Sequence, residues 1–291
     1  MGDRLLNRGA ALVIAKSSRD QFFVTTEETR IEDLRIAFSI EKSLKAEPNA
    51  ATLTVYNAAP QTLALLRERP LSVTLEVGYD GDLARAFVGD LTYAATTTDG
   101  PNRVTKIQAG DGARAHRSAR VSRTFRAGTD ARTAVAEAAS SMGLKIPTSL
   151  ADVDELRQQF ASGVTLEGPS QAEMTRILKA KGMDWSVQDG TLAVYRARDH
   201  RNDPPIIFTT ESGERVEGVR ILGSPEEGAP TKETKVPSLK FRAQLYPQIL
   251  PGARIEVRAR DVQGIYRVER VAHTGDTGGG DWQTEVEGKP L

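Results

Sequence analysis

The sequence contains no cysteine among its 291 residues. Disulfides, thiolate nucleophiles and cysteine-ligated zinc or iron–sulfur sites are therefore excluded. The length exceeds that of a typical single core and favours two or three domains. Their stability must come from packing or from assembly with other chains.

Long hydrophobic runs are also absent. No apolar segment approaches the roughly 20 residues that a membrane-spanning helix needs. The apolar stretch at residues 10–15 is shorter than the core of a secretory signal and has no convincing cleavage site. A composition of 39% hydrophobic and 27% charged residues is typical of a soluble globular protein. We therefore expect no targeting signal and no membrane partner.

The chain has no excess of either charge, because 39 basic residues balance 39 acidic ones. The whole molecule thus offers no large field for holding nucleic acid. Basic residues nevertheless dominate one stretch, in which only Asp111 and Asp130 are acidic: Arg103, Lys106, Arg114, Arg117, Arg120, Arg123, Arg126 and Arg132. Three interpretations stay open, in this order: a solvated strand face, a subunit-interface or lumen-facing patch, and specific DNA recognition.

Motifs for catalysis and cofactor binding are missing. The three histidines, His116, His200 and His273, are far apart and form no metal-binding or triad spacing. No nucleophile-elbow, P-loop or dinucleotide-binding glycine motif occurs. We expect no catalytic, cofactor-binding or metal-binding residue.

Acidic residues offer weak candidates for a site. The loop at residues 274–281 places Asp276 and Asp281 among glycines, but the EF-hand spacing is absent, so a flexible hairpin loop is the preferred interpretation over an ion site. A glycosidase would need two carboxylates facing each other across a sugar. The candidate pairs are Asp152/Asp154, Glu226/Glu227 and Asp276/Asp281. All are expected in loops or on solvated faces, which favours a surface role.

Three aromatic residues lie on expected strands: Trp185, Trp282 and Tyr266. An aromatic in such a position usually belongs to the core rather than to a sugar-binding or base-stacking surface. We expect these three to pack inside.

Residues 31–111 show mainly strand periodicity. Leu34, Ile36, Phe38 and Ile40 alternate with small or charged residues, which predicts a half-buried strand. Further strands are expected near residues 52–56, 73–79, 87–91 and 104–109. One short helix, begun by Pro60 and ended by Pro70, interrupts them. The pattern predicts a β-barrel with one helix.

The pattern changes to helices after residue 126. Thr129 is expected to cap a helix that ends at Gly143, and residues 170–173 form a capping box for another helix. A short helix is expected between them, at residues 152–160. The Asp189-Gly190 pair then predicts a tight hairpin turn. This stretch reads as a small α+β module.

Beyond residue 204 the sequence suggests strands only, separated by turns that contain glycine and proline. The predicted fold is therefore mainly β, with two β-barrel domains and an α+β insert. The expected divisions are an N-terminal arm (1–30), a first barrel with one helix (31–112), a strand that links to or belongs to the second barrel (113–126), the α+β module (127–203) and the second barrel (204–291).

The order of elements resembles the baseplate hub proteins of contractile-tailed phages and related injection machines. Residues shared with that pattern run through the first barrel: Pro48, Asn49, Val55, Tyr56, Asn57, Gly78, Tyr79, Phe87, Gly89 and Asp90. The Asp189-Gly190 hairpin and residues 251–288 continue the likeness. The resemblance implies two barrels of tail-tube type in each subunit and assembly as a homotrimer.

The same resemblance implies a function. Three copies of two barrels would adapt a sixfold tail tube to a threefold central spike and line the channel for the genome, which passes without specific binding. Implied partners are a tail tube or distal tail protein, the spike, the tape measure protein and other baseplate proteins. The protein would be assembled in the host bacterial cytoplasm and reside in the virion tail. We expect no enzyme; the alternatives are a tail-tip enzyme acting on peptidoglycan or carbohydrate, and a receptor-binding β module.

Overall fold

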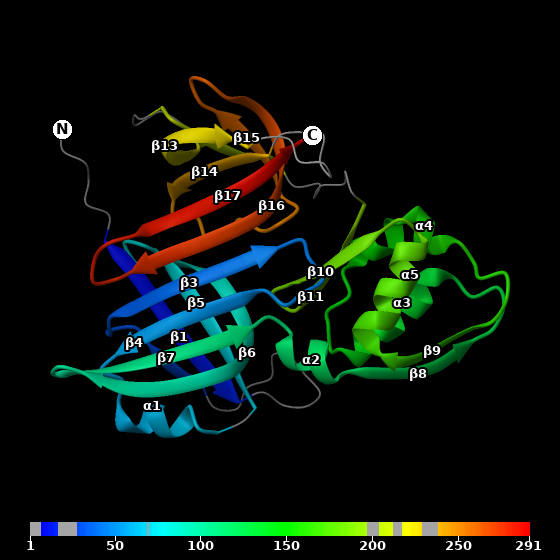
Figure 1. The fold of residues 1–291 in the computed structure, drawn as a ribbon, viewed down its shortest axis with the longest axis horizontal. Helices are drawn as coiled ribbons and strands as arrows, with labels where there is room; N and C mark the ends of the chain where they lie inside the picture. The colour runs from blue at the N-terminus through cyan, green and yellow to red at the C-terminus, as the bar shows by residue number, and fades with distance from the viewer. Residues whose placement is uncertain (1–6, 17–27, 69, 197–203, 212–216, 229–237) are drawn as a thin grey trace.

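The computed structural model describes residues 7–16, 28–68, 70–196, 204–211, 217–228 and 238–291. Strands make up 54% of the structure and helices 17%, which confirms the mainly β fold. A single sheet of thirteen strands runs through most of the molecule, and a smaller α+β body lies to one side of it (Figure 1). No described helix has the length and apolar character to cross a membrane.

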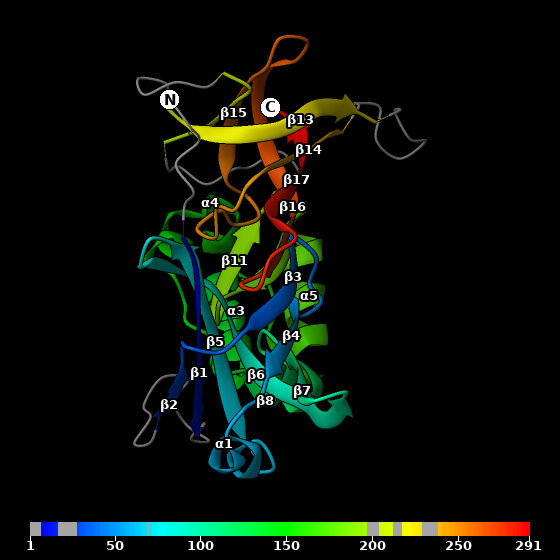
Figure 2. The ribbon, with the colours of Figure 1, turned by 90° about the vertical axis from the view of Figure 1, so that its left-hand side faces the viewer.

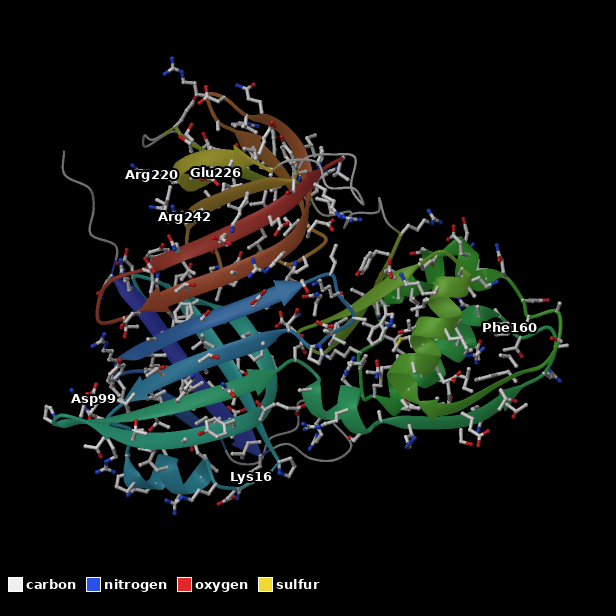
Figure 3. The ribbon with its side chains drawn as sticks, viewed as in Figure 1. Lys16, Asp99, Phe160, Arg220, Glu226 and Arg242 are labelled. Carbon is white, nitrogen blue, oxygen red and sulfur yellow. The ribbon has the colours of Figure 1, made fainter. Side chains whose placement is uncertain are left out.

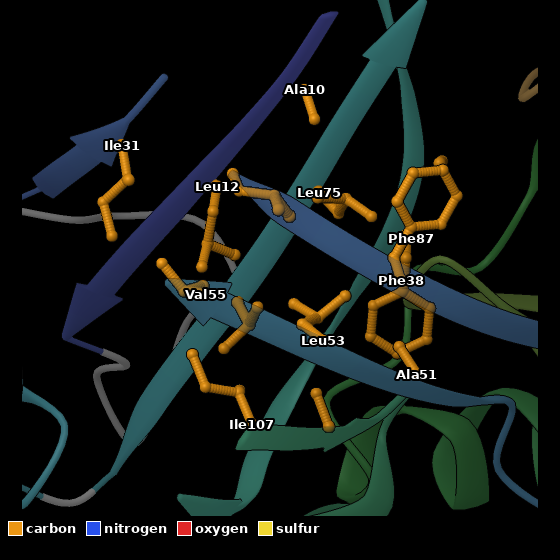
Figure 4. Packing of buried hydrophobic residues seen from close by; sticks show 14 of the residues in the cluster. Ala10, Leu12, Ile31, Phe38, Ala51, Leu53, Val55, Leu75, Phe87 and Ile107 are labelled. Carbon is orange, nitrogen blue, oxygen red and sulfur yellow. The ribbon is translucent and has the colours of Figure 1, made fainter. Parts of the chain in front are cut away.

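The first part of the sheet is formed by the N-terminal half of the chain. Its strands, in spatial order, are β3 (Ile36–Ser43), β4 (Ala50–Tyr56), β7 (Asn102–Gly110), β6 (Asp82–Asp99), β5 (Leu71–Tyr79), β1 (Arg8–Lys16) and β2 (Glu28–Ile31). The alternating pattern buries one side of each strand, and Leu12, Leu53 and Phe87 converge in the core (Figure 4). Helix α1 (Pro60–Leu65) begins with proline in its first turn, as predicted.

The C-terminal strands form a closed barrel. They are β12 (Ile206–Thr209), β13 (Val219–Glu227), β14 (Leu239–Gln244), β17 (Trp282–Pro290), β16 (Gln263–Asp276) and β15 (Arg254–Arg258). Closure occurs because β15 pairs with both β12 and β16. Phe208 and Phe241 pack edge to face in the core of this barrel, with ring centroids 5.1 Å apart.

One long strand joins the two parts. The start of β16 pairs with β15 in the closed barrel, and its end pairs with β3 in the first part, with Ile40 opposite His273 and Phe38 opposite Gly275. The two parts are therefore stacked one above the other, as Figure 2 shows, and share one backbone ladder. We call this contact the barrel seam.

Gly275 is required where the seam is tightest. A Cβ atom built there would lie 2.4 Å from Cζ of Phe38 and 2.6 Å from Cε3 of Trp282. Without it, the Phe38 and Trp282 rings meet edge to face, with centroids 5.3 Å apart. Glycine at this position thus lets aromatic side chains fill the space between the two parts.

The insert between β7 and β12 has its own hydrophobic core. Its elements are α2 (Ala113–Ser118), β8 (Arg120–Phe125), α3 (Ala131–Ser141), a 3-10 helix (Thr148–Asp152), α4 (Asp154–Arg157), β9 (Val164–Pro169), α5 (Ser170–Ala180), β10 (Asp184–Gln188) and β11 (Thr191–Tyr195). Helices α3 and α5 pack on each other and on the β8–β9 ribbon. As predicted, Asp189 and Gly190 both have positive φ, at 50° and 77°, and turn the β10–β11 hairpin.

Two predicted helix caps are wrong. Asp130, not Thr129, caps α3, because its carboxylate accepts from the backbone N–H of Thr133 at 2.7 Å. Helix α5 has no capping box, since Ser170 is already inside the helix and its hydroxyl bonds to that of Ser141 at 2.7 Å. In both cases a neighbouring polar group was the better partner.

Two stretches had alternative interpretations in the sequence. Residues 10–15 of the expected N-terminal arm, interpreted as a strand or an arm, lie in β1, which pairs with β5 and buries Leu12 and Ile14 completely. Strand β8 pairs with β9 and buries Val121 in the insert core, so it does not belong to the second barrel. The domain boundaries themselves stay a prediction, and the boundary expected near residues 198–205 falls largely outside the described residues.

Candidate functional site

The histidines do not form a site. His116 lies on α2, where burial lowers its pKa, and its ring centroid is 6.4 Å from that of Trp185. His273 lies at the barrel seam, and His200 is outside the described residues. In the described ranges, no group of three or more His, Asp or Glu residues is arranged to hold a metal ion.

His273 is buried completely, and its Nδ1 lies 2.9 Å from the hydroxyl of Thr284. Burial, with a smaller contribution from the charge of Lys42, lowers its pKa to about 3. The imidazole is therefore neutral at any physiological pH. Its Nε2 has no hydrogen-bond partner among the described residues.

The glycine-rich loop holds a structural ion pair. The guanidinium of Arg35 donates to Asp276 at 2.7 Å, and the backbone N–H of Gly278 donates to the same carboxylate at 2.8 Å. These hydrogen bonds, the Arg35 bond first, lower the pKa of Asp276. A carboxylate held in this way is suited to fixing the loop rather than to exchanging protons. Asp281 lies beside it, in the lining of a shallow groove.

The other carboxylate pairs lie apart from any enclosed site. Asp154 bonds to Arg157 on the exposed helix α4, directly after the 3-10 helix that ends at Asp152. Glu226 and Glu227 are exposed on β13.

The three aromatic candidates belong to cores, as predicted. Trp185 is 2% exposed and donates from Nε1 to the hydroxyl of Thr175 at 2.9 Å. Trp282 is 6% exposed and lies in the core of the first part of the sheet. Tyr266 is 7% exposed and lies in the core of the closed barrel. None of them forms a binding platform.

A buried polar cluster joins the insert to the first part of the sheet, and we call it the insert joint. Lys42 has no exposed surface, and its Nζ donates to both carboxylate oxygens of Asp189, at 2.9 and 2.8 Å. Asp111, also fully buried, accepts from the backbone N–H groups of Asp189 at 2.6 Å and Gly190 at 2.9 Å. The hairpin turn is thus held through its side chain and its backbone at once.

The charge balance of the joint perturbs Asp111. Burial first, and then the neighbouring charge of Asp189, raise its pKa to about 7, against the opposing effect of the two backbone hydrogen bonds and Lys42. Two carboxylates therefore share one lysine: Lys42 and Asp111 are fully buried, and the Asp189 side chain is 19% exposed. Asp111 therefore exchanges its proton near neutral pH.

Amide side chains complete the insert joint. Asn49 donates to the backbone oxygen of Val187 at 2.8 Å and accepts from the backbone N–H of Ser43 at 2.9 Å. Gln188 donates in return to the backbone oxygen of Ser43 at 2.8 Å. A second contact lies at the end of β11, where Arg267 of β16 donates to the backbone oxygen of Arg196 at 3.2 Å. The insert is therefore fastened to the sheet at both ends of its hairpin.

Sequence analysis did not find this joint. Asp189 was expected only as a turn residue, and Asn49 only as part of a family pattern. The missed signal lies in the strand alternation, because Ile36, Phe38 and Ile40 face the core and Lys42 continues the same face. A lysine at such a position requires a buried anion.

The opposite side of the sheet is a continuous polar surface that spans both parts, and we call it the outer face. Its residues come from β14, β17, β16, β3, β4 and β7: Lys240, Arg242, Gln244, Gln283, Glu285, Glu287, Arg270, Ala272, Thr274, Ser39, Glu41, Thr52, Thr54, Lys106 and Gln108. Figure 3 shows Arg242 on this side of the sheet and Arg220 and Glu226 on the neighbouring strand β13.

Charges on the outer face are mixed and paired. Lys240 lies 3.0 Å from Glu285, and Arg270 bonds to Glu41 at 2.6 Å. Small hydroxyl and methyl side chains occupy the centre, where β3, β4 and β16 line a shallow groove of about 360 Å³ with Ser39, Thr52 and Thr274. The surface thus has no strong field of either sign.

The basic cluster lies elsewhere. Arg114 and Arg117 belong to α2, and Arg120 and Arg123 belong to β8, all in the insert (Figure 1). Only Lys106 of the basic stretch reaches the outer face.

Comparison with known proteins gives one family. The model of the family described as baseplate hub gp41 matches residues 19–212, more than half of the chain. No curated protein sequence matches.

Solved structures show the same fold. A tail protein from Neisseria meningitidis gives a TM-score of 0.61 at 12% identity and covers 97% of this chain and 96% of its own. The 43 kDa tail protein of prophage MuSo2 from Shewanella oneidensis gives 0.59 at 12% identity over 95% of both chains. The Escherichia coli c3393 protein, a type VI secretion component described as similar to the T4 tail proteins gp27 and gp5, gives 0.58 at 11% identity over 89% of this chain and 74% of its own.

Proposed function

Since the chain belongs to the baseplate hub gp41 family and has a structural role in the phage tail, we propose that it connects the tail tube to the central spike and lines the channel for the genome. The outer face carries this proposal. It extends without interruption across both barrels, as the wall of a channel must, and its ion pairs leave no field that would hold DNA.

We propose a closed homotrimer, with the first barrel of one subunit against the second barrel of the next. Six barrels of two related kinds would then form a ring that meets a sixfold tube on one side and a threefold spike on the other. The edge strand β2 supports this arrangement, because in the described part of the chain it pairs only with β1 and leaves its other edge for a neighbour. Spike, tail tube, tape measure and other baseplate proteins are the proposed partners, and the host cytoplasm is the proposed place of assembly.

A symmetric reconstruction of the intact tail tip tests the arrangement. We expect three copies, contacts that each bury more than about 2,000 Å², and the outer face toward the lumen. A dimer, a ring of six copies of this chain, or a lumen surrounded by Arg117, Arg120 and Arg123 would contradict the proposal.

A charge substitution tests the channel wall separately. Ser39→Arg with Thr52→Arg adds two positive charges to the centre of the outer face, and we expect particles that assemble but lose infectivity because DNA is retained. Ser162→Arg with Ala172→Arg adds the same charge to the exposed surface of the insert and serves as the control. Equal infectivity of the two variants, at equal particle number, would remove the channel role.

We also propose that the protein has no hydrolase activity. Its family and its structural neighbours are tail proteins, and Asp276 is engaged by Arg35 rather than facing a second free acid. A zymogram on peptidoglycan checks this. Clearing by the natural protein that disappears on Asp276→Ala or Asp281→Ala would establish the enzyme alternative instead.

A further inference from the structure

The β8–β9 ribbon of the insert has one covered edge and one open edge. On β9, the backbone oxygen of Thr165 accepts from Nη2 of Arg176 at 3.1 Å, so helix α5 covers that edge. In the part of the chain that the structure describes, β8 pairs only with β9. Figure 1 shows β8 at the lower margin of the insert, next to β9.

The register shows which backbone groups face outward. The oxygen of Thr165 points away from β8, so its partner Thr124 must also point its backbone groups away from β9. Pro169, opposite Arg120, agrees with this alternation because proline has no N–H to donate to β8. Among the described residues, the N–H and C=O groups of Arg120, Ser122 and Thr124 therefore form a row of donors and acceptors without a backbone partner.

Four arginines accompany this edge. Arg117, Arg120, Arg123 and Arg126 are exposed, and none forms an ion pair within the described ranges. Arg120 shares the solvent side of the ribbon with Ser122, and Arg123 projects on the side of the helices. Positive charge is thus present on both sides of the same open edge.

We propose that the open edge of β8 accepts an extended acidic segment of a partner protein as a third strand of the ribbon. Backbone pairing would supply affinity, and carboxylates on both faces of the added strand would meet Arg120 and Arg123, since guanidinium and carboxylate groups pair in a bidentate manner. The same arginines repel basic strands and so keep the edge from pairing with unsuitable chains. This inference rests on the insert alone and does not depend on the channel role.

A protein segment fits these features better than nucleic acid. Duplex DNA would use the four charges but not the row of backbone donors and acceptors on Arg120, Ser122 and Thr124. The chain as a whole also has no net charge to attract DNA. The two ligands therefore differ in whether binding requires the strand edge.

The experiment measures fluorescence anisotropy of a short labelled peptide, made of glutamate and threonine in equal numbers, on titration with the full chain. Ser122→Pro removes one outward N–H without touching the β8–β9 ladder, because proline is tolerated on an edge strand whose N–H faces solvent. Arg120→Glu with Arg123→Glu reverses the charge. Arg220→Glu with Arg242→Glu makes the same charge change on the barrel strands β13 and β14 and is the matched control (Figure 3).

We expect saturable binding that weakens about tenfold with Ser122→Pro and at least tenfold with the Arg120 and Arg123 reversal. The control pair should leave the affinity unchanged. A peptide N-methylated at alternate residues keeps its charge and loses its donors, and it should also bind about tenfold more weakly, which tests the edge even if a protein variant fails to fold.

Three outcomes would overturn the proposal. If no saturable binding is observed, the arginines would serve only to keep this edge strand from pairing with other chains. Equal binding of the N-methylated peptide and equal binding to Ser122→Pro would show attraction by charge only. A labelled DNA duplex that binds more tightly than the peptide, and equally well to Ser122→Pro, would make the surface a nucleic-acid site.

Discussion

The barrel seam joins two parts of one sheet, whereas the insert joint attaches a separate α+β body to that sheet. At the seam, β16 and β3 share a backbone ladder, and the rings of Phe38 and Trp282 fill the space above it. At the insert joint, a lysine, two aspartates and two amides hold one hairpin turn.

The seam and the insert joint differ in which of their groups carry a charge that depends on pH. Backbone hydrogen bonds do not titrate, so the pH dependence of the seam comes from side chains beside the ladder, among them the buried imidazole of His273. The insert joint has one more carboxylate than ammonium groups, and its strength follows the ionisation of those groups. The insert joint therefore responds to pH through a buried carboxylate, whereas the seam responds through a buried imidazole.

The largest effect is expected at the insert joint. Lys42→Met removes the cation and leaves Asp189 and Asp111 facing each other, which should lower the free energy of unfolding by roughly 3–5 kcal/mol. Urea denaturation measures this change. Lys240→Met removes a lysine from the exposed pair with Glu285 and should cost less than about 1 kcal/mol. Equal losses in the two variants would show that the buried ion pair of Lys42 contributes no more to the free energy of unfolding than an exposed ion pair.

At the barrel seam, the sharpest test is Gly275→Ala. The added methyl group would meet Phe38 and Trp282 at 2.4 and 2.6 Å, and neither ring can withdraw without moving the other. We expect a loss of about 2–3 kcal/mol in the free energy of unfolding, at the upper end of overpacking effects. Gly163→Ala, at an exposed glycine without positive φ whose added methyl group would meet only the backbone oxygen of Phe125 at 3.1 Å, provides the control for losing a glycine. A loss no larger than that of the control would remove the role assigned to the rings.

Acid should also weaken the seam through His273. Its folded pKa, about 3, lies below the value of the unfolded chain, about 6.5, so the unfolded state binds the proton first and stability falls as the pH drops below 6.5. Between pH 6.5 and 4.5 the natural protein should lose roughly 2 kcal/mol more than His273→Gln. Thermal unfolding across this range measures the difference. Parallel pH profiles would mean that the imidazole is not held neutral.

The smallest effect has the opposite sign and belongs to Asp111. Its folded pKa of about 7 lies above the unfolded value of about 3.9, so its contribution to stability is present at low pH and is lost as the pH rises through 7. From pH 8 to pH 6 the natural protein should gain roughly 1 kcal/mol relative to Asp111→Asn. His273 contributes equally in both proteins and cancels. The protection factors of the Val187 and Gly190 amides, which correct for the intrinsic exchange rate at each pH, should rise over the same interval, whereas lower protection factors at pH 6 would reverse the sign.

The sequence predicts the sheet well because burial on one side leaves a period of two. Ile36 to Ile40, Val73 to Tyr79 and the strands β13 to β17 were found in this way, whereas Leu34 lies in a bend and β12 was missed. The turn at Asp189-Gly190 was found because positive φ selects these residues. The sharing of β16 between the two parts could not be predicted, since pairing between distant strands leaves no local pattern.

The candidate sites show the same limit. Isolated acids and histidines could be dismissed because their spacing matched no chemical arrangement, but the insert joint combines Lys42, Asn49, Asp111 and Asp189 from four separate elements. Only the fold brings them together. The caps of α3 and α5 were mistaken for a related reason, because several polar residues competed for the same backbone N–H groups and local sequence did not rank them.

The shared strand has a mechanical consequence. With 14 residues, β16 extends on the order of 45 Å, and a pull along its axis loads its seven paired positions with β3 in shear, so that they resist together rather than open one after another. A sideways pull on the insert acts instead on the side-chain hydrogen bonds of the insert joint and on the Arg267–Arg196 bond at the other end of the hairpin. The two parts of the sheet should therefore resist a pull along β16 more strongly than the insert resists a sideways pull.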